Sequence, residues 1–319
     1  MPLIDMPVEE LVRYQGINPC PPDLDTFWDE AVREMHTIDP RVELVPSAFQ
    51  VPYADCFDLF FTGVGGARIH AKYLRPKQVC APHPGVVHLH GYSVNAGGWA
   101  DKLSYVALGF SLVALDCRGQ GGLSQDLGGV VGTTLNGHII RGLDDAPRNL
   151  LFRHIFLDAA QLAGILMEMP EVDAQRVGAF GGSQGGGLTL ACAALEPRVV
   201  RAAAAFPFLC DYRRVWEMDL CVDAYAELAY YFRTFDPEHL REEETFTKLG
   251  YIDVQHLSKR IRGEVLMFTG LMDKVCPPST QFAAYNKITA PKTVKIYPDF
   301  GHEWSYRIVD EMVTFLAAL

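Results

Sequence analysis

The sequence predicts an α/β fold in which helices flank a mainly parallel sheet. Eight short apolar segments typical of strands occur along the 319 residues, and the later ones alternate with segments of helical periodicity. Strands that alternate with helices of this length usually pair in parallel through right-handed crossovers. Given the chain length and a hydrophobic content of 49%, we expect residues 1–319 to form a single domain.

The first predicted element is a helix at residues 22–35, which forms an N-terminal extension before the strands. Phe27, Ala31 and Met35 lie at helical spacing, and Asp25 is placed to cap the helix. The predicted strands are 57–62, 68–74, 85–90, 112–116, 177–181, 200–205, 264–269 and 293–297. The helices predicted between and after them are 99–108, 150–169, 188–195, 279–288 and 305–319.

Two stretches depart from this alternation. Residues 123–148 are rich in Gly and Asp and lack periodicity, which indicates a long excursion over one face of the sheet. Residues from about 206 to 260 have helical patterns and aromatic side chains but no clear strand. We therefore expect a cap-like helical insertion after the sixth strand.

Residues 181–185 read Gly-Gly-Ser-Gln-Gly, with Ser183 at the centre, between the fifth predicted strand and a helix of small residues. Gly-x-Ser-x-Gly in this position is typical of the nucleophile elbow of α/β-hydrolases, where glycines permit a strained turn and close packing. A glycine-rich connection or a phosphate-binding loop is the alternative interpretation. No Lys follows the glycines, and no GxGxxG precedes an acidic residue at the required distance, so the pattern favours a serine nucleophile.

A serine nucleophile requires a base and an orienting acid, which follow it in the chain in α/β-hydrolases. Asp273 follows the strand at 264–269 and His302 follows the strand at 293–297, so both lie at carboxyl ends of strands. We expect His302 to be the base and Asp273 the acid. Asp273 could instead cap the helix that follows it, and His302 could be a core or capping residue. Asp299 is a rival acid, but it lies too close to His302 in sequence for easy orientation.

Two backbone N–H groups are expected to form the oxyanion hole that stabilises a tetrahedral intermediate. One is the N–H of Gln184, directly after the nucleophile. The other is the N–H of Tyr92, in the loop after the third predicted strand, where Gly91 permits a tight turn. The Tyr92 ring could also cover the site.

Composition excludes several classes of partner. The formal net charge is −11 and no run of Lys or Arg occurs, which argues against binding to nucleic acid or to an anionic membrane surface. The N-terminus does not have the pattern of a signal peptide, and no apolar run approaches the length of a membrane span. The eight cysteines are scattered, as expected for free thiols in a reducing cytoplasm. His88 and His90 alternate on a strand without a third ligand at metal spacing, so we expect no metal site there.

Three motifs together resemble those of carbohydrate esterase family seven, which contains acetyl xylan esterases and cephalosporin C deacetylases. They are Arg-Gly-Gln at 118–120, Gly-Gly-Ser-Gln-Gly-Gly at 181–186 and His-Glu at 302–303, and segments 25–28 and 271–280 are also similar. The resemblance implies the triad and oxyanion residues named above. It also implies removal of acetyl groups from small O-acetylated substrates without a cofactor, and assembly into a homohexamer.

The resemblance also gives structural signature positions at Arg118, Gln120 and Glu303. We expect Arg118 to brace the loop that carries His302 and Glu303, because its rigid fork can hold loop carbonyls or a carboxylate. Pro207 and Phe208, which follow the sixth strand, are candidate walls of the substrate pocket, although core packing would explain them equally well. The segments after Tyr92 and at 149–153 depart from the family pattern, which leaves the preferred leaving group open.

Three alternatives share these features. An acyltransferase would pass the acyl group to an alcohol, and a serine peptidase of the prolyl-oligopeptidase type would have the same fold and triad order. The chain is too short to add a propeller domain to this fold, and no site for a peptide terminus is evident. A catalytically inactive binding protein is disfavoured by the intact Ser183, Asp273 and His302.

Overall fold

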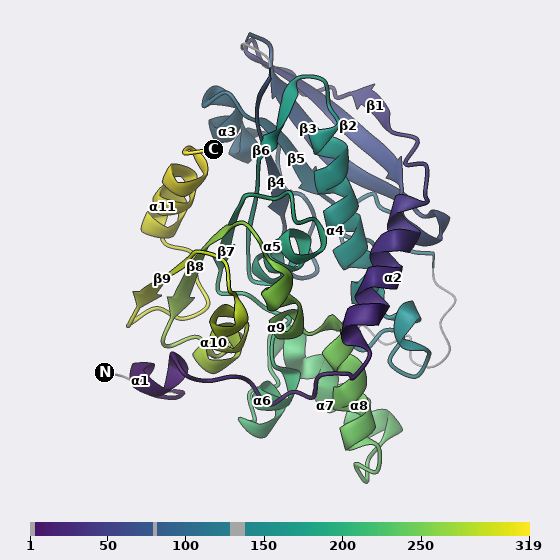
Figure 1. Ribbon diagram of the computed structural model, residues 1–319, viewed down its shortest axis with the longest axis vertical. Helices are drawn as coiled ribbons and strands as arrows, with labels where there is room; N and C mark the ends of the chain where they lie inside the picture. Colours follow the sequence, from purple (N-terminus) through teal and green to yellow (C-terminus); the bar gives the residue numbers. More distant parts are fainter. Residues whose placement is uncertain (1–3, 79–81, 128–137) are drawn as a thin grey trace.

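The computed structural model describes residues 4–78, 82–127 and 138–319. Within these residues, nine strands form one sheet in the order β1-β2-β3-β5-β4-β6-β7-β8-β9 (Figure 1). The strands are β1 (Glu43–Pro46), β2 (Ala54–Thr62), β3 (Arg68–Pro76), β4 (His83–Leu89), β5 (Ser111–Leu115), β6 (Val172–Gly182), β7 (Arg201–Ala205), β8 (Glu264–Gly270) and β9 (Lys292–Tyr297).

Helices pack on both faces of this sheet. The α-helices are α1 (Val8–Leu11), α2 (Leu24–His36), α3 (Leu103–Ala107), α4 (Leu151–Met167), α5 (Gln184–Leu195), α6 (Tyr212–Glu217), α7 (Ala226–Phe235), α8 (Glu242–Leu249), α9 (Val254–Leu257), α10 (Pro278–Lys287) and α11 (Tyr306–Leu316). Short 3₁₀ helices lie at Val64–Gly66, Ala100–Lys102, Pro147–Asn149, Asp223–Tyr225, Gly250–Ile252 and Ser258–Arg260.

The sheet changes from antiparallel to parallel along its width. β1 to β3 pair antiparallel, and β3 pairs antiparallel with β5. From β5 onward every neighbouring pair is parallel. The predicted α/β-hydrolase fold is therefore confirmed, with nine strands in place of eight. The additional strand, β1, is short and exposed along its whole length, so it has none of the apolar alternation that reveals a strand in sequence.

The core has two layers because side chains of a strand alternate between faces. On β4, Val87 and Leu89 lie in the cluster with α2, α4 and α5, whereas Val86 lies in the cluster with α3 and α11. α4 is buried along nearly its whole length, between the sheet and α2. Packing on both faces explains why the central strands β5, β7 and β8 are nearly continuous apolar runs.

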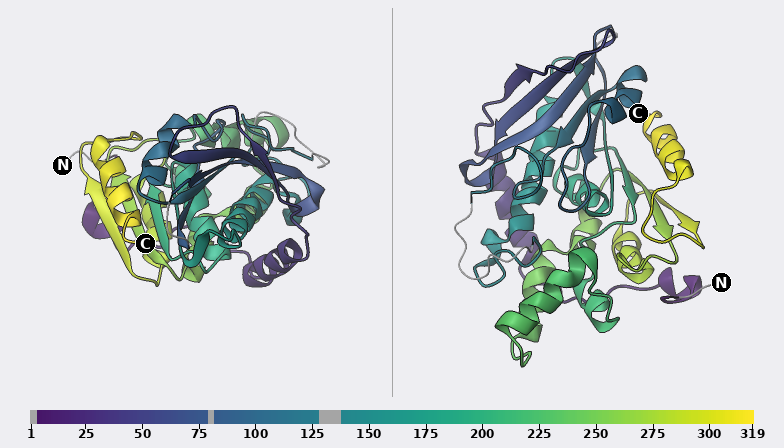
Figure 2. Two further views of the ribbon diagram at one scale, coloured as in Figure 1. Left: turned by 90° about the horizontal axis from the view of Figure 1, so that it is seen from above. Right: turned by 180° about the vertical axis from the view of Figure 1, so that it is seen from behind.

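The predicted helical insertion is also confirmed. Residues between β7 and β8 contain α6 to α9 and no strand among the described residues. Figure 2 shows these helices at one end of the molecule, opposite the antiparallel strands β1 to β3. Of the predicted excursion at 123–148, residues 128–137 lie outside the described residues.

Several predicted helices differ in detail from the structure. The helix predicted at 188–195 begins earlier, at Gln184. The helix predicted at 99–108 is divided into a 3₁₀ turn and α3, at Ala100–Lys102 and Leu103–Ala107. Asp25 does not cap α2, which begins at Leu24 after Asp23. Asp25 lies in the first turn and instead accepts hydrogen bonds from Lys259 and Arg260, 2.7 Å and 3.3 Å away, so it ties the N-terminal extension to the end of the insertion.

No helix among residues 4–78, 82–127 and 138–319 combines the length and apolar character needed to cross a bilayer.

Gly185→Ala is expected to lower the free energy of unfolding by about 3 kcal/mol or more, because a Cβ at Gly185 would overlap the Leu89 carbonyl oxygen of β4. Gly164→Ala is the matched control in another buried helix, since its Cβ would meet only ordinary contacts at 3.5 Å. Alanine there should be neutral or stabilise by about 0.5–1 kcal/mol. Urea unfolding followed by circular dichroism measures both, and equal effects would contradict the packing argument.

Candidate active site

Ser183 lies on a strained turn between the end of β6 and the start of α5. Its φ of 58° and ψ of −122° are unfavourable for a residue with a side chain. Neighbouring backbone holds the turn in place: the Ser183 N–H donates to the Ala205 carbonyl at 3.0 Å, and the Ser183 carbonyl accepts from the N–H groups of Gly187 and Phe208 at 3.1 and 3.0 Å. The hydroxyl is consequently held at the carboxyl ends of the parallel strands.

His302 links Ser183 to Asp273 by two short contacts. The distance from His302 Nε2 to Ser183 Oγ is 2.8 Å, and the distance from His302 Nδ1 to Asp273 Oδ2 is also 2.8 Å. His302 follows β9 and Asp273 follows β8, so the three residues come from the ends of three strands. With a proton on Nδ1 donated to the carboxylate, Nε2 is free to accept the serine proton.

Asp273 is fixed by further donors from its own loop. Its Oδ1 accepts from the N–H groups of Val275 and Cys276 at 2.9 and 2.8 Å, and Gln281 Nε2 lies 3.3 Å from Oδ2. The carboxylate is fully buried, and α10 begins at Pro278 with Pro277 at its N-cap, so Asp273 does not cap that helix. Asp299, the rival acid, is exposed to solvent. The partner of the imidazole is thus the carboxylate of Asp273.

The loop after β4 lies against the elbow, with Tyr92 and Gln184 as sequence reasoning proposed. Gln184 is the first residue of α5, so its backbone N–H has no acceptor within the helix. The Gln184 side chain donates to the carbonyl of Gly91 at 3.3 Å, directly before Tyr92. This bond joins the two segments that carry the candidate oxyanion donors.

Gln120 strengthens the same junction. Its amide and that of Gln184 face each other, with N···O distances of 2.8 and 3.1 Å, and its Oε1 also accepts from the Ser93 N–H at 2.9 Å. Gln120 therefore fixes the position of the loop after β4 relative to the elbow.

Arg118 does not brace the loop that carries His302 and Glu303, so that expectation is wrong. Its guanidinium forms a bidentate pair with Asp158 of α4, at 2.6 and 2.7 Å, and donates to the Val64 carbonyl at 3.1 Å. Both members of the pair are almost completely buried. Since α4 lies behind the sheet, Arg118 joins the turn after β5 to the helix layer.

The other sequence-predicted positions surround the elbow. Glu303 is exposed, and its Oε1 accepts from the Gly301 N–H at 3.2 Å within the same loop. Phe208 is fully buried and its ring lies 5.6 Å from that of Tyr92, while Pro207 is also buried. Phe206 packs on the His302 ring, with 4.7 Å between centroids.

His88 and His90 are involved in local packing. The His90 Nε2 accepts from the Cys117 N–H at 3.0 Å, and the His88 ring stacks on Phe180 with centroids 4.9 Å apart. Within the described residues no group of three or more His, Cys, Asp or Glu side chains could hold a metal ion.

Sequence reasoning missed three side chains near the site. Trp304 packs against Gly182 and on Phe206, with 5.2 Å between ring centroids. His138 has its ring 5.0 Å from that of Tyr92 and its Nε2 3.1 Å from Ser93 Oγ. Glu227 of α7 accepts from the Ile139 N–H at 2.8 Å and so fixes the segment that carries His138. Trp304, directly after the His-Glu motif, had a usable signal in sequence, whereas the pairing of Glu227 with residues about 90 positions away had none.

Burial raises the pKa of Glu227 to about 7. An unfolded chain loses this proton near the ordinary value of about 4.3, so between these two values the folded chain binds more protons. The unfolding free energy should therefore fall as pH rises through this window, by at most about 1.4 kcal/mol per pH unit from this group.

Glu227→Gln is expected to remove that component, so that its stability relative to wild type increases between pH 5 and pH 7.5. Urea midpoints across this range measure the effect, with Glu244→Gln as the control on an exposed carboxylate. Parallel pH profiles for Glu227→Gln and wild type would contradict the assignment.

A family model described as acetyl xylan esterase matches residues 1–319. The acetyl esterase Axe7A of Xylanibacter ruminicola is 28% identical over 290 residues, which are 88% of this chain but 63% of that protein. The chain thus spans less than two thirds of the length of this curated relative.

Two solved structures are similar over almost the whole chain. Acetyl xylan esterase 1 from Thermoanaerobacterium sp. JW/SL YS485 has 61% identity and a TM-score of 0.97, with 98% of this chain and 99% of that chain covered. The acetyl xylan esterase from Paenibacillus sp. R4 has 35% identity and a TM-score of 0.93 with the same coverage. Ser183, His302 and Asp273 are in contact at the ends of three strands. The chain that carries them belongs to the acetyl xylan esterase family.

Proposed function

We propose that this chain is a serine esterase that removes acetyl groups from small O-acetylated substrates through an acetyl-serine intermediate. The observation that carries the proposal is the continuous contact from Ser183 Oγ through His302 to the buried carboxylate of Asp273. Family membership supports ester hydrolysis as the reaction.

In acylation, His302 Nε2 takes the Ser183 proton as Oγ attacks the acetyl carbonyl carbon. The backbone N–H groups of Tyr92 and Gln184 are the proposed donors to the oxyanion that forms. Asp273 stabilises the imidazolium, and His302 then protonates the departing alcohol as the carbon–oxygen bond breaks.

Deacylation repeats this proton transfer with water. His302, neutral again, removes a proton from water as the water oxygen attacks the acetyl carbon. The second tetrahedral intermediate then breaks its bond to Oγ, which takes the proton from His302, so that acetic acid leaves and Ser183 is restored. No step requires a cofactor. The network of Gln120, Gln184 and Gly91 keeps both candidate donors in place throughout.

The relatives named above are acetyl and acetyl xylan esterases, which makes acetylated xylo-oligosaccharides the first substrate to test, with cephalosporin C as the second. Pro207 and Phe208 are the proposed pocket walls. Because both are buried beside the elbow, they would restrict the acyl group more than the alcohol.

Ser183→Ala is expected to lower kcat on p-nitrophenyl acetate by about 10⁴-fold or more, because the nucleophile is lost while the fold is retained. Asp273→Asn should lower it by roughly 10⁴-fold, since the amide favours the wrong imidazole tautomer. Glu303→Gln is the control on an exposed neighbour and should retain most activity.

The same assay should include butyrate and octanoate esters, acetylated xylo-oligosaccharides, cephalosporin C and a chromogenic prolyl peptide. Ser183-dependent hydrolysis that falls with acyl length supports the deacetylase, and the relative rates rank sugar against antibiotic. Cleavage of the peptide, or a preference for octanoate, would contradict the proposed substrate class.

We further propose that residues 1–319 form one α/β-hydrolase domain with its cap-like insertion at about 206–260, that the chain is cytoplasmic, and that it assembles as a homohexamer. Trp304 and Tyr306, beside His302, are 51% and 85% exposed, which supports burial of this surface in an assembly. Light scattering should give about six times the chain mass of 35.4 kDa, and cell fractionation should recover the protein in the cytoplasm. A monomeric mass or a secreted protein would contradict these proposals.

A further inference from the structure

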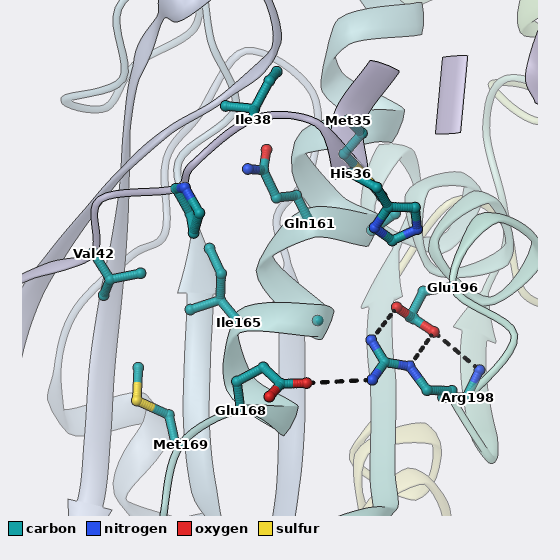
Figure 3. Close-up of a pocket in the computed structure, with 13 residues that line it drawn as sticks. Met35, His36, Ile38, Val42, Gln161, Ile165, Glu168, Met169, Glu196 and Arg198 are labelled. Carbon is teal, nitrogen blue, oxygen red and sulfur yellow. Dashed lines mark hydrogen bonds and ion pairs between the residues drawn. The ribbon is translucent and has the colours of Figure 1, made fainter. Parts of the chain in front are cut away.

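A cavity of about 410 Å³ lies away from the candidate active site (Figure 3). It is formed by the second half of α4, the end of α2 with the segment that follows it, and the turn before β7. This turn and the end of α4 precede the strands β7 and β6, so the cavity lies at the amino ends of the strands, whereas Ser183, Asp273 and His302 lie at the carboxyl ends. Its volume is within the usual range for sites that hold small organic molecules.

The walls of the cavity are mostly apolar. Met35, Ile38 and Val42 line it on one side, and Ile165 and Met169 of the α4 region line it on the other. A ligand with an aliphatic or aromatic body would remove this apolar surface from water and gain about 25 cal/mol for each Å² buried.

Gln161 lines this cavity and carries a hydrogen-bond acceptor that is not used within the described residues. The residue is 8% exposed, and its Nε2 donates to the Thr62 carbonyl at 3.0 Å, which fixes the orientation of the amide. Its Oε1 is buried and has no hydrogen-bond partner among the described residues. Figure 3 shows the amide between Ile38 and Met35. Because a buried acceptor without a donor is costly, a ligand that brings a donor would be favoured.

The charged side chains at the cavity exclude an anionic ligand. Arg198 pairs with Glu196 at 2.7 Å and with Glu168 at 3.5 Å, as Figure 3 shows. Two carboxylates thus pair with one guanidinium, which donates to Glu196 through Nε and Nη2 and to Glu168 through Nη1. A second anion here would meet net negative charge and no free cation in this cluster.

We propose that this cavity is a non-catalytic binding site for a neutral hydroxyl compound with an apolar body. The aliphatic or aromatic part would lie against Met35 and Ile165, and the hydroxyl would donate to Gln161 Oε1 once the Ile38 side chain beside the amide shifts to expose it. The site is independent of ester hydrolysis, since none of its residues contacts Ser183, His302 or Asp273.

Methionine-methyl NMR on the full chain at pH 8 tests the proposal, with the signals of Met35 and Met169 assigned by leucine substitution. Three probes of similar shape are titrated: 4-ethylphenol, ethylbenzene and 4-ethylbenzoate. We expect 4-ethylphenol to shift both signals and to bind about ten-fold more tightly than ethylbenzene, which lacks the donor. The benzoate should bind most weakly of the three.

Variants distinguish the contribution of the Gln161 acceptor to binding from that of the apolar cavity. Gln161→Met should abolish the preference for 4-ethylphenol over ethylbenzene, and Gly164→Leu should block all three probes by filling the space beside Arg198. Glu168→Gln, which removes one carboxylate that lines the cavity, should reduce the difference in affinity between 4-ethylbenzoate and 4-ethylphenol. Hydrolysis of p-nitrophenyl acetate should be unchanged in every variant, which reports that each is folded.

Equal affinity of wild type for 4-ethylphenol and ethylbenzene would overturn the proposal, and so would the absence of shifts at Met35 and Met169. Tightest binding of the benzoate, or a preference that survives in Gln161→Met, would also overturn it. These readouts are binding affinities, so failure here leaves the esterase proposal unaffected.

Discussion

The close packing of the serine turn is the constraint on which the rest of the site depends. Ser183 is held at positive φ by hydrogen bonds to the backbone of Ala205, Gly187 and Phe208. Gly181 and Gly185, two residues before and after Ser183, lie directly against neighbouring backbone, so the first turn of α5 approaches β4 more closely than any side chain permits. The strain is thereby maintained by the sheet and the helix, and the hydroxyl needs no flexible segment to reach His302.

Much of this architecture could be predicted from sequence, because parallel strands buried on both faces leave unmistakable apolar runs. All eight predicted strands occur, and Ser183, Asp273 and His302 could be named because each follows a strand in the chain order of the fold. Arg118 could not be placed correctly. Its partner Asp158 lies 40 positions away inside a buried helix, and sequence does not show which side of the sheet a guanidinium turns toward.

The supporting residues were the least predictable. Glu227 lacks a motif of its own, and it acts by a contact with the Ile139 N–H that exists only after distant segments have packed together. Asp25 shows a related limit. Its position suited a helix cap, but nearby Lys259 and Arg260 provide stronger partners than a backbone amide does. Local preference indicates what a residue can do, and tertiary neighbours decide between the possibilities.

The two outer strands of the sheet have a consequence for how copies of this chain meet. An unpaired strand edge is a template on which the backbone of another molecule can add. β1 is only four residues long and ends at Pro46, which has no N–H to offer, while β9 carries Lys292 and Lys295. Both edges thus discourage uncontrolled growth by backbone pairing. Crowded or heat-stressed chains would therefore have few routes into fibrous aggregates through this sheet.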